Sequence, residues 1–192
     1  MTKEIDFYFD FISPYSYLAH KKIQSLPHKI KINYMPILLG GLQNLQGVVA
    51  PAFIKPKLKH MINDCDLIAK KNKFSFTWNT KFPLNSLYIM RGNFCVDSGI
   101  KDLYIDNMFN AYWKDNLDIS NEEILNSLLE KCKITKDKFY QGIKDQKIKD
   151  ELKNITKDAF DKEIFGAPTF VVNDKIFWGQ DRLEFALKES NK

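Results

Sequence analysis

A short motif near the start of the chain carries residue types that could bind an anion. Ser13-Pro14-Tyr15-Ser16 stands where an alternating strand pattern gives way to a helical one. The first N–H groups of a helix and the helix dipole stabilise a bound anion, and a serine hydroxyl can rotate to donate a hydrogen bond to it. One interpretation of Ser13 is therefore an anion-binding hydroxyl. The other is an ordinary helix N-cap, which is common.

A second motif near the other end places a proline directly before a strand pattern. In Phe165-Gly166-Ala167-Pro168-Thr169-Phe170, the bond before Pro168 is a candidate for a cis peptide, which usually marks a tight turn. An ordinary proline at the start of a strand is the alternative.

The first motif is also the dithiol sequence Cys-Pro-Tyr-Cys with both sulfurs replaced by oxygen. Thiol–disulfide exchange needs an attacking thiolate, so dithiol redox chemistry is not expected there.

The elements that must position these motifs follow from hydrophobic periodicity. Residues 5–12 alternate as a strand, residues 15–26 have helical spacing, and residues 29–37 alternate again. A strand, a helix and a strand within about 35 residues predict a parallel, right-handed βαβ unit. Near the other end, residues 168–172 and 175–178 predict a hairpin with its turn at Asn173-Asp174, followed by a helix over 181–188.

The middle of the chain, from residue 53 to residue 160, is mostly helical in pattern. Buried stripes are expected at Tyr104, Ile105, Met108, Phe109 and Tyr112, and a capping box is expected from Ser120 to Glu123. The fold class is thus α/β, a mixed sheet in the order β-α-β, then β-β-α, with a large all-helical insertion. The predicted domains are 1–40 together with 161–192, and an insertion over 41–160.

Composition and charge exclude several classes of protein. The net charge is +5, but lysines and acids are interleaved without a tight basic run, which disfavours nucleic-acid binding and leaves a mild attraction for small anions. No apolar run reaches the roughly 18 residues of a membrane span, and no secretory signal is apparent. Three widely spaced cysteines and three scattered histidines predict no disulfide framework, no metal site and a cytoplasmic location: Cys65, Cys95, Cys132, His20, His28 and His60.

Taken together, the motifs resemble the 2-hydroxychromene-2-carboxylate isomerase family. This family is related to kappa-class glutathione transferases, within the DsbA-like branch of the thioredoxin fold. The resemblance rests on residues 6–19, 165–170 and 177–183, with echoes at 82–86 and 111–120. It implies a thioredoxin-like sheet in which the cis-proline faces the first helix.

The resemblance also implies roles for individual residues. Ser13 matches the catalytic serine, which hydrogen-bonds the glutathione sulfur, and Ala167 before Pro168 matches the position whose main chain pairs with the cysteinyl part. Asp181 and Arg182 match the pair that holds the γ-glutamyl end, where a carboxylate suits the ammonium and a guanidinium the carboxylate. The implied glutathione-binding set is Ser13, Ala167, Pro168, Asp181, Arg182 and Lys57, the last near the glycine carboxylate.

One segment departs from the family. Val48 stands where the family commonly has a glutathione-contacting asparagine, so either a nearby residue such as Asn44 substitutes or the pocket has diverged. Trp113 and Trp178 are expected to be packing residues. The alternative is that they line a pocket for an aromatic substrate. Tyr15 and Tyr17 flank the serine, and one of them could touch the substrate.

The activity implied is a glutathione-dependent cis–trans isomerisation of a small aromatic or unsaturated acid. Glutathione is the expected cofactor, and a homodimer is suggested by the resemblance alone. Two alternatives stay open. One is a kappa-like glutathione transferase or peroxidase that uses the same site, and the other is a non-catalytic glutathione-binding protein.

Overall fold

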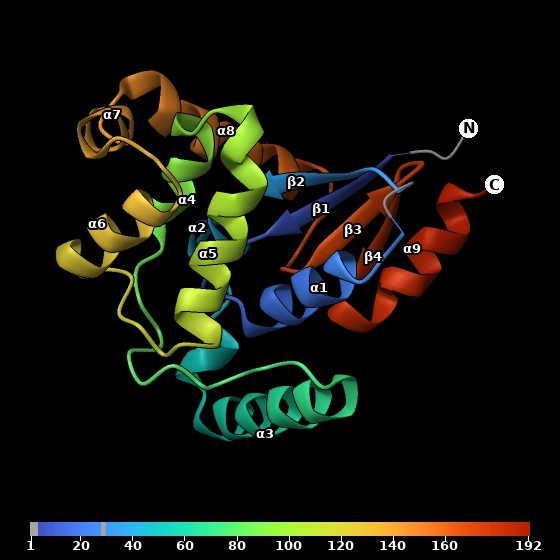
Figure 1. Ribbon diagram of the computed structural model, residues 1–192. Helices are drawn as coiled ribbons and strands as arrows, with labels where there is room; N and C mark the ends of the chain where they lie inside the picture. The colour runs from blue at the N-terminus through green and yellow to red at the C-terminus, as the bar shows by residue number, and fades with distance from the viewer. Residues whose placement is uncertain (1–3, 28–29) are drawn as a thin grey trace.

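A four-stranded mixed sheet forms the centre of one half of the molecule (Figure 1). The computed structural model describes residues 4–27 and 30–192. The strand order is β2-β1-β3-β4; β1 pairs in parallel with β2 and antiparallel with β3, and β3 pairs antiparallel with β4. This confirms the predicted thioredoxin-like sheet. The strands are β1 (Ile5–Phe9), β2 (Ile32–Pro36), β3 (Thr169–Val172) and β4 (Lys175–Trp178).

Helices cover both faces of the sheet and extend well beyond one end of it. In Figure 1, α1 and α9 lie in front of the sheet, α3 lies below α1, and α4 to α7 gather to the left. The helices are α1 (Pro14–Gln24), α2 (Leu39–Gln46), α3 (Lys55–Asn72), α4 (Leu87–Cys95), α5 (Lys101–Trp113), α6 (Glu122–Lys131), α7 (Lys136–Gly142), α8 (Gln146–Asp161) and α9 (Leu183–Ser190). Three short 3-10 turns are η1 (Pro51–Phe53), η2 (Ser98–Ile100) and η3 (Gln180–Arg182).

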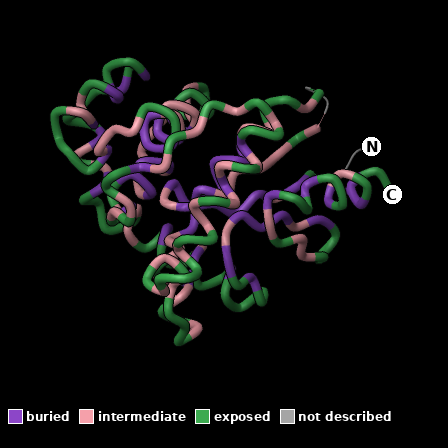
Figure 2. Tube along the Cα trace, turned by 90° about the horizontal axis from the view of Figure 1, so that it is seen from below, coloured by how far each residue is buried: buried purple, intermediate pink, exposed green. Residues whose placement is uncertain are grey.

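Strand β1 is buried on both faces, as the central strand of a covered sheet should be. The rings of Phe7 and Phe170 stack 5.1 Å apart on the face that α1 and α9 cover. On the other face, Tyr8 packs in a smaller cluster with Leu42 of α2 and Ala159 of α8. Figure 2 shows this buried path running through the centre of the trace. The turn after β1 is therefore held firmly from both sides.

The C-terminal hairpin agrees with the sequence prediction. Asn173 and Asp174 both have positive φ, 51° and 59°, which is the type I′ geometry that suits the twist of a two-residue hairpin. The predicted second strand is shorter than expected. Its first residue, Lys29, lies outside the described residues, and so does His28 of the histidine set.

One local prediction in the middle of the chain needs correction, and one helix was not predicted. The N-cap of α6 is Asn121, whose side chain accepts from the N–H of Ile124, while Ser120 bonds back to Asp118 instead. Helix α2 was not expected, because the sequence Leu39-Gly40-Gly41 has weak helix propensity. Its first turn is stabilised from outside: the Asp10 carboxylate accepts a hydrogen bond from the N–H of Leu39 at 2.8 Å.

The two predicted domains share one core. The rings of Phe11, next to β1, and Phe109 of α5 lie 4.9 Å apart and are both fully buried. The indole N–H of Trp113 donates to the backbone oxygen of Phe11 at 2.8 Å. The division into 1–40 with 161–192 and 41–160 stays a prediction, and any such insertion packs directly on the strand that leads to Ser13.

Candidate functional site

Ser13 is the N-cap residue of α1, in the turn that follows β1. Its Oγ accepts a hydrogen bond from the backbone N–H of Ser16 at 3.1 Å and donates one to the backbone oxygen of Ala167 at 2.9 Å. The first turn of α1 contains no acidic residue. The positive end of the helix dipole is therefore available to an outside anion. The hydroxyl serves as a helix cap and also faces the loop before β3.

The loop before β3 lies directly against Ser13, although 154 residues separate Ser13 and Ala167 in the chain. The Ala167–Pro168 peptide bond is cis, as predicted. The hydroxyl of Thr169 donates to the oxygen of Gly166 at 2.7 Å, and the N–H of Gly179 donates to the oxygen of Pro168 at 2.9 Å. The structure thus brings Ser13, Ala167 and Pro168 together.

Ser16, the second serine of the motif, lies behind this contact. It is fully buried, and its Oγ has no hydrogen-bond partner among the described residues. A buried hydroxyl without a partner is uncommon, since burying a polar group costs free energy that a hydrogen bond normally offsets. The motif therefore contains one hydroxyl that bonds the cis-proline loop and one buried hydroxyl without a hydrogen-bond partner among the described residues.

The two tyrosines of the motif anchor it to the rest of the protein. The hydroxyl of Tyr15 donates to the Asp64 carboxylate on α3 at 2.8 Å, and that of Tyr17 donates to the backbone oxygen of Ser75. Burial raises the pKa of both phenols, and for Tyr15 the hydrogen bond to Asp64 adds to the effect. Both side chains are thus held in place as neutral donors.

Lys57 lies in the first turn of α3 and is exposed. It precedes Asp64 by seven residues, which puts both on the same side of α3 and about 10 Å apart along the helix. Because Asp64 holds Tyr15 beside Ser13, Lys57 lies on the flank of the site. The structure gives it no direct contact with Ser13 or the cis-proline loop.

Asp181 and Arg182 lie in η3 and are exposed. The Arg182 guanidinium pairs with the Asp181 carboxylate. The turn follows directly after Gly179, whose N–H bonds Pro168. These two charged residues therefore follow closely on a contact with the cis-proline loop, and they pair with each other.

The divergent segment after α2 is exposed. Gly47 ends α2 in the left-handed conformation with φ of 67°, and Val48 and Asn44 are both solvent-exposed. The amide of Gln46 donates to the backbone oxygen of Ile164 at 3.3 Å, which ties this end of α2 to the approach of the cis-proline loop. The departure from the family pattern thus falls beside the candidate site.

The two tryptophans that could line a substrate pocket have different environments. Trp113 is fully buried, so its packing role is confirmed. Trp178 is 53% exposed and its ring lies 5.0 Å from that of Phe165, which is 51% exposed. An added Cβ on Gly166 would lie 2.7 Å from the Trp178 indole nitrogen, so the glycine allows the ring to rest on the loop. This aromatic pair borders the site.

Sequence reasoning missed Asp10, a fully buried carboxylate three residues before Ser13. It accepts from the N–H groups of Ile12 and Leu39, and Ser13 donates its own N–H to the Asp10 backbone oxygen. Burial raises the pKa of Asp10 to about 6, against the lowering effect of these hydrogen bonds. The alternation of strand residues at Asp6, Tyr8 and Asp10 was the available signal, but it does not say which carboxylate is buried.

Asp10 should make the stability of the protein fall as pH rises. Its pKa is near 3.9 in an unfolded chain and about 6 in the folded one, so the folded state holds a proton that the unfolded state lacks between those values. Asp10 contributes fully to the free energy of unfolding below about pH 4. This contribution, roughly 3 kcal/mol, is lost as the pH rises through about 6. Urea unfolding at about pH 4.5 and about pH 7.5 should register about 2 kcal/mol of this change, because the rest is lost below about pH 4.5.

The matched variant for this prediction is Asp10→Asn, which has the same shape and does not titrate. Other groups titrate equally in both proteins, so the difference between their pH dependences isolates Asp10. The stability of the variant should fall less over this range. Parallel curves for the two proteins would contradict the assigned role.

The cysteines are free thiols. Burial raises the pKa of the Cys65 and Cys132 thiols, and that of Cys95 to about 11. They are therefore protonated at neutral pH, and a thiolate is the reactive form. Within residues 4–27 and 30–192, no group of three or more His, Cys, Asp or Glu side chains could hold a metal ion. The same ranges contain no helix with the length and apolar character to cross a bilayer.

The fold and the site together define a thioredoxin-like protein whose Ser13 faces a cis-proline loop. The model of the DSBA-like thioredoxin domain matches residues 4–190, and the chain belongs to this family. It is 29% identical over 189 residues, 96% of each chain, to a 2-hydroxychromene-2-carboxylate isomerase of Sphingobium xenophagum. A solved structure of a 2-hydroxychromene-2-carboxylate isomerase is similar with a TM-score of 0.86 and 25% identity, covering 94% of this chain and 91% of that one.

A shorter similarity connects the chain to a second kind of protein. Over 69 residues, 34% of this chain and 30% of the relative, it is 41% identical to glutathione S-transferase kappa 1 of Caenorhabditis elegans. The resemblance stated from the motifs is therefore confirmed for the family and the fold.

Proposed function

We propose that this chain is a glutathione-dependent isomerase of the 2-hydroxychromene-2-carboxylate type. The named relatives that span nearly the whole chain support the isomerase part. The observation that carries the glutathione part is the contact between the Ser13 hydroxyl and the Ala167 backbone oxygen at the N-terminus of α1. A thiol-binding serine there needs a sulfur from outside, because the motif has none of its own.

The residues present fit a peptide-like thiol. Ala167 offers a backbone oxygen to a peptide N–H, and Ser13 offers one hydroxyl proton, which it now donates to that same oxygen. A ligand N–H at the Ala167 oxygen would free the Ser13 proton to turn toward a neighbouring sulfur. Asp181 and Arg182 would hold the γ-glutamyl end and Lys57 the glycine carboxylate, as charge complementarity requires. Binding and thiol activation are thereby coupled through one proton.

The chemistry needs an acidified thiol. When bound, glutathione would supply a thiolate that adds reversibly to the conjugated double bond of the acid, which lets that bond rotate before the thiolate leaves. Ser13 stabilises the negative sulfur by donating to it, and the N-terminus of α1 adds positive potential. A lowering of the thiol pKa by one unit corresponds to about 1.4 kcal/mol of preference for the thiolate.

The exposed aromatic pair beside the site suits an aromatic substrate. The Phe165 and Trp178 rings lie 5.0 Å apart, and the Trp178 indole rests on Gly166, next to Ala167. Aromatic rings prefer offset or edge-to-face contacts with such a pair. An acid with an aromatic ring could stack there while its side chain reaches the thiolate.

The test combines binding with turnover. Reduced glutathione should give saturable heat in titration calorimetry, and 2-hydroxychromene-2-carboxylate should isomerise only when glutathione is present. S-methylglutathione, which has no ionisable thiol, is the control and should bind without supporting turnover. Equal turnover with and without glutathione would overturn the proposal.

A second candidate rests on the kappa-class similarity. A glutathione transferase or peroxidase would use the same site and release a conjugate or oxidised glutathione. Chlorodinitrobenzene and an organic hydroperoxide, assayed beside the chromene, separate these activities. The exposed Val48 segment favours a third possibility, a protein that binds glutathione and turns over none of these substrates.

A further inference from the structure

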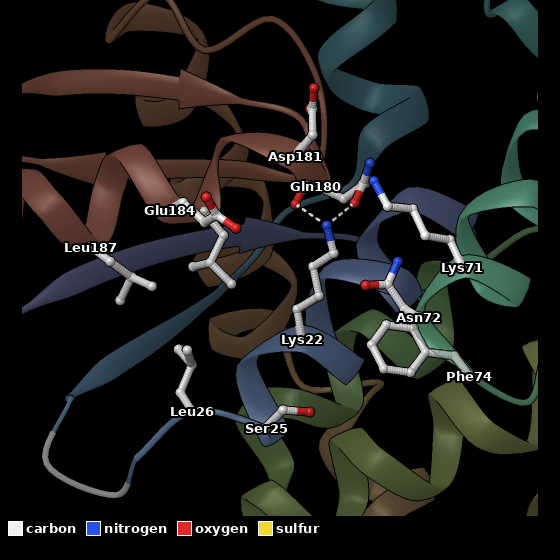
Figure 3. A pocket seen from close by; sticks show the side chains of 11 residues that line it. Lys22, Ser25, Leu26, Lys71, Asn72, Phe74, Gln180, Asp181, Glu184 and Leu187 are labelled. Carbon is white, nitrogen blue, oxygen red and sulfur yellow. Dashed lines mark hydrogen bonds between the residues drawn. The ribbon is translucent and has the colours of Figure 1, made fainter.

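A second concave site lies at the C-terminal half of α1, away from Ser13 (Figure 3). It has a volume of about 430 Å³ and is enclosed by α1, the end of α3, η3 and the start of α9. Lys22, which reaches into it from α1, follows Ser13 by nine residues, or about 13 Å along the helix axis. The pocket therefore lies away from the N-terminus of α1, although Asp181 belongs to its lining.

Two ammonium groups converge in this pocket. Lys22 Nζ donates to the backbone oxygen of Gln180 at 3.2 Å and to its side-chain oxygen at 2.5 Å. Lys71, in the last turn of α3, points its ammonium toward the same Gln180 side chain (Figure 3). Like charges brought together in this way repel each other, so an anion between them would be stabilised.

These two ammonium groups differ from their neighbours in their ion pairing. Among the described residues, no Asp or Glu oxygen lies within 4.0 Å of Lys22 or Lys71. The preceding lysine on each helix does have such a partner: Lys21 lies 3.6 Å from Asp106, and Lys70 lies 2.6 Å from Asp66. Burial lowers the pKa of Lys22, and the charge of Lys71 acts in the same direction, against Asp181 and Glu184.

The two acidic residues of the lining leave the lysine end positive. The Asp181 carboxylate pairs with Arg182 and points away from Lys22, as Figure 3 shows. Glu184 lies on α9, on the same side of Lys22 as Leu26 and Leu187 in Figure 3. Phe74 lies on the other side of Lys22, with Lys71 and Asn72. The pocket thus has a cationic end and an apolar side.

We propose that this pocket binds a small organic carboxylate with an apolar body, its carboxylate between Lys22 and Lys71 and its body against Phe74. The amide of Gln180 would add a neutral donor at the carboxylate end. Such a site does not use Ser13, and it shares Asp181 of its lining with the γ-glutamyl end of the proposed glutathione site.

Titration calorimetry with benzoate tests the proposal, and inorganic phosphate serves as the comparison probe. Benzoate should bind with a dissociation constant below about 10 mM, and Lys22→Gln with Lys71→Gln should weaken it at least about tenfold. The matched control is Lys21→Gln with Lys70→Gln, which removes the same two charges one residue earlier on the same helices. It should leave benzoate binding within about twofold of the parent protein.

Two single-residue variants distinguish benzoate binding in this pocket from binding at the Ser13 site. Lys71 is exposed, so Lys71→Gln alone keeps the fold and should still weaken benzoate severalfold. Ser13→Ala should leave benzoate binding unchanged, whatever it does to glutathione. Equal loss in both double variants, a loss in Ser13→Ala, or no saturable benzoate binding would each overturn the proposal. Phosphate that binds as tightly as benzoate would also overturn it, since the apolar wall would then contribute nothing.

Discussion

Replacing Ser13 with alanine should lower the glutathione-dependent isomerisation rate by about 10²- to 10³-fold, the usual loss when one preorganised donor to a developing anion is removed. The Ser13 hydroxyl both caps α1 and contacts the Ala167 oxygen. Its removal should also raise the pKa of the bound glutathione thiol, by about one unit or more. The ultraviolet absorbance of the thiolate, followed against pH, measures this shift.

Ser16→Ala is the matched control, because it deletes the same atom from the same turn. The Ser16 hydroxyl has no partner among the described residues, so its loss should leave the thiol pKa within about 0.3 unit of the parent value. Ser13→Ala should also cost about 1 kcal/mol of stability through the lost cap, which thermal unfolding would register separately. An unchanged thiol pKa in Ser13→Ala would remove the hydroxyl from the mechanism. Equal shifts of the thiol pKa in Ser13→Ala and Ser16→Ala would mean that the effect comes from a general disturbance of the first turn of α1 and not from the Ser13 hydroxyl.

The parts of the fold that local patterns determine were predictable from the sequence. The alternation of strand β1 and the Asn173-Asp174 turn each depend on neighbouring residues, and both are found in the structure. The cis bond before Pro168 was also expected, because the resemblance of the motifs to the family implies it. The pairing of Ser13 with this loop followed from the two motifs considered together.

The parts that depend on distant contacts were not predictable. Helix α2 begins where Asp10, in the turn after β1, accepts its first N–H, and no pattern within Leu39-Gly40-Gly41 indicates that. The pocket beside Lys22 forms only because Gln180 comes to it from 158 residues away. Lysines such as Lys22 and Lys71 look like solvated surface in a sequence with 29 lysines and arginines. Which lysines pair with a carboxylate is visible only in three dimensions.

The core at Trp113 connects the helical part of the chain to the site. The Trp113 ring is fully buried and stacks 5.8 Å from Phe76, while its N–H holds the backbone oxygen of Phe11, two residues before Ser13. Trp113→Ala should therefore cost about 3–5 kcal/mol of unfolding free energy. Trp113→Phe keeps much of the packing but leaves the Phe11 oxygen without its partner, at about 1–3 kcal/mol.

Chemical denaturation followed by circular dichroism measures both variants, with Trp178→Phe as the control. Trp178 is half exposed, so that change should stay within about 0.5 kcal/mol. Because the Phe11 oxygen precedes Ser13 so closely, Trp113→Phe should also lower the isomerisation rate of the molecules that remain folded. Trp178→Phe should leave the stability of the protein unchanged. If 41–160 were an insertion that folds alone, Trp113→Ala would split the unfolding curve into two transitions. We expect a single shifted transition, because the rings of Phe11 and Phe109 belong to one core that neither part can complete without the other.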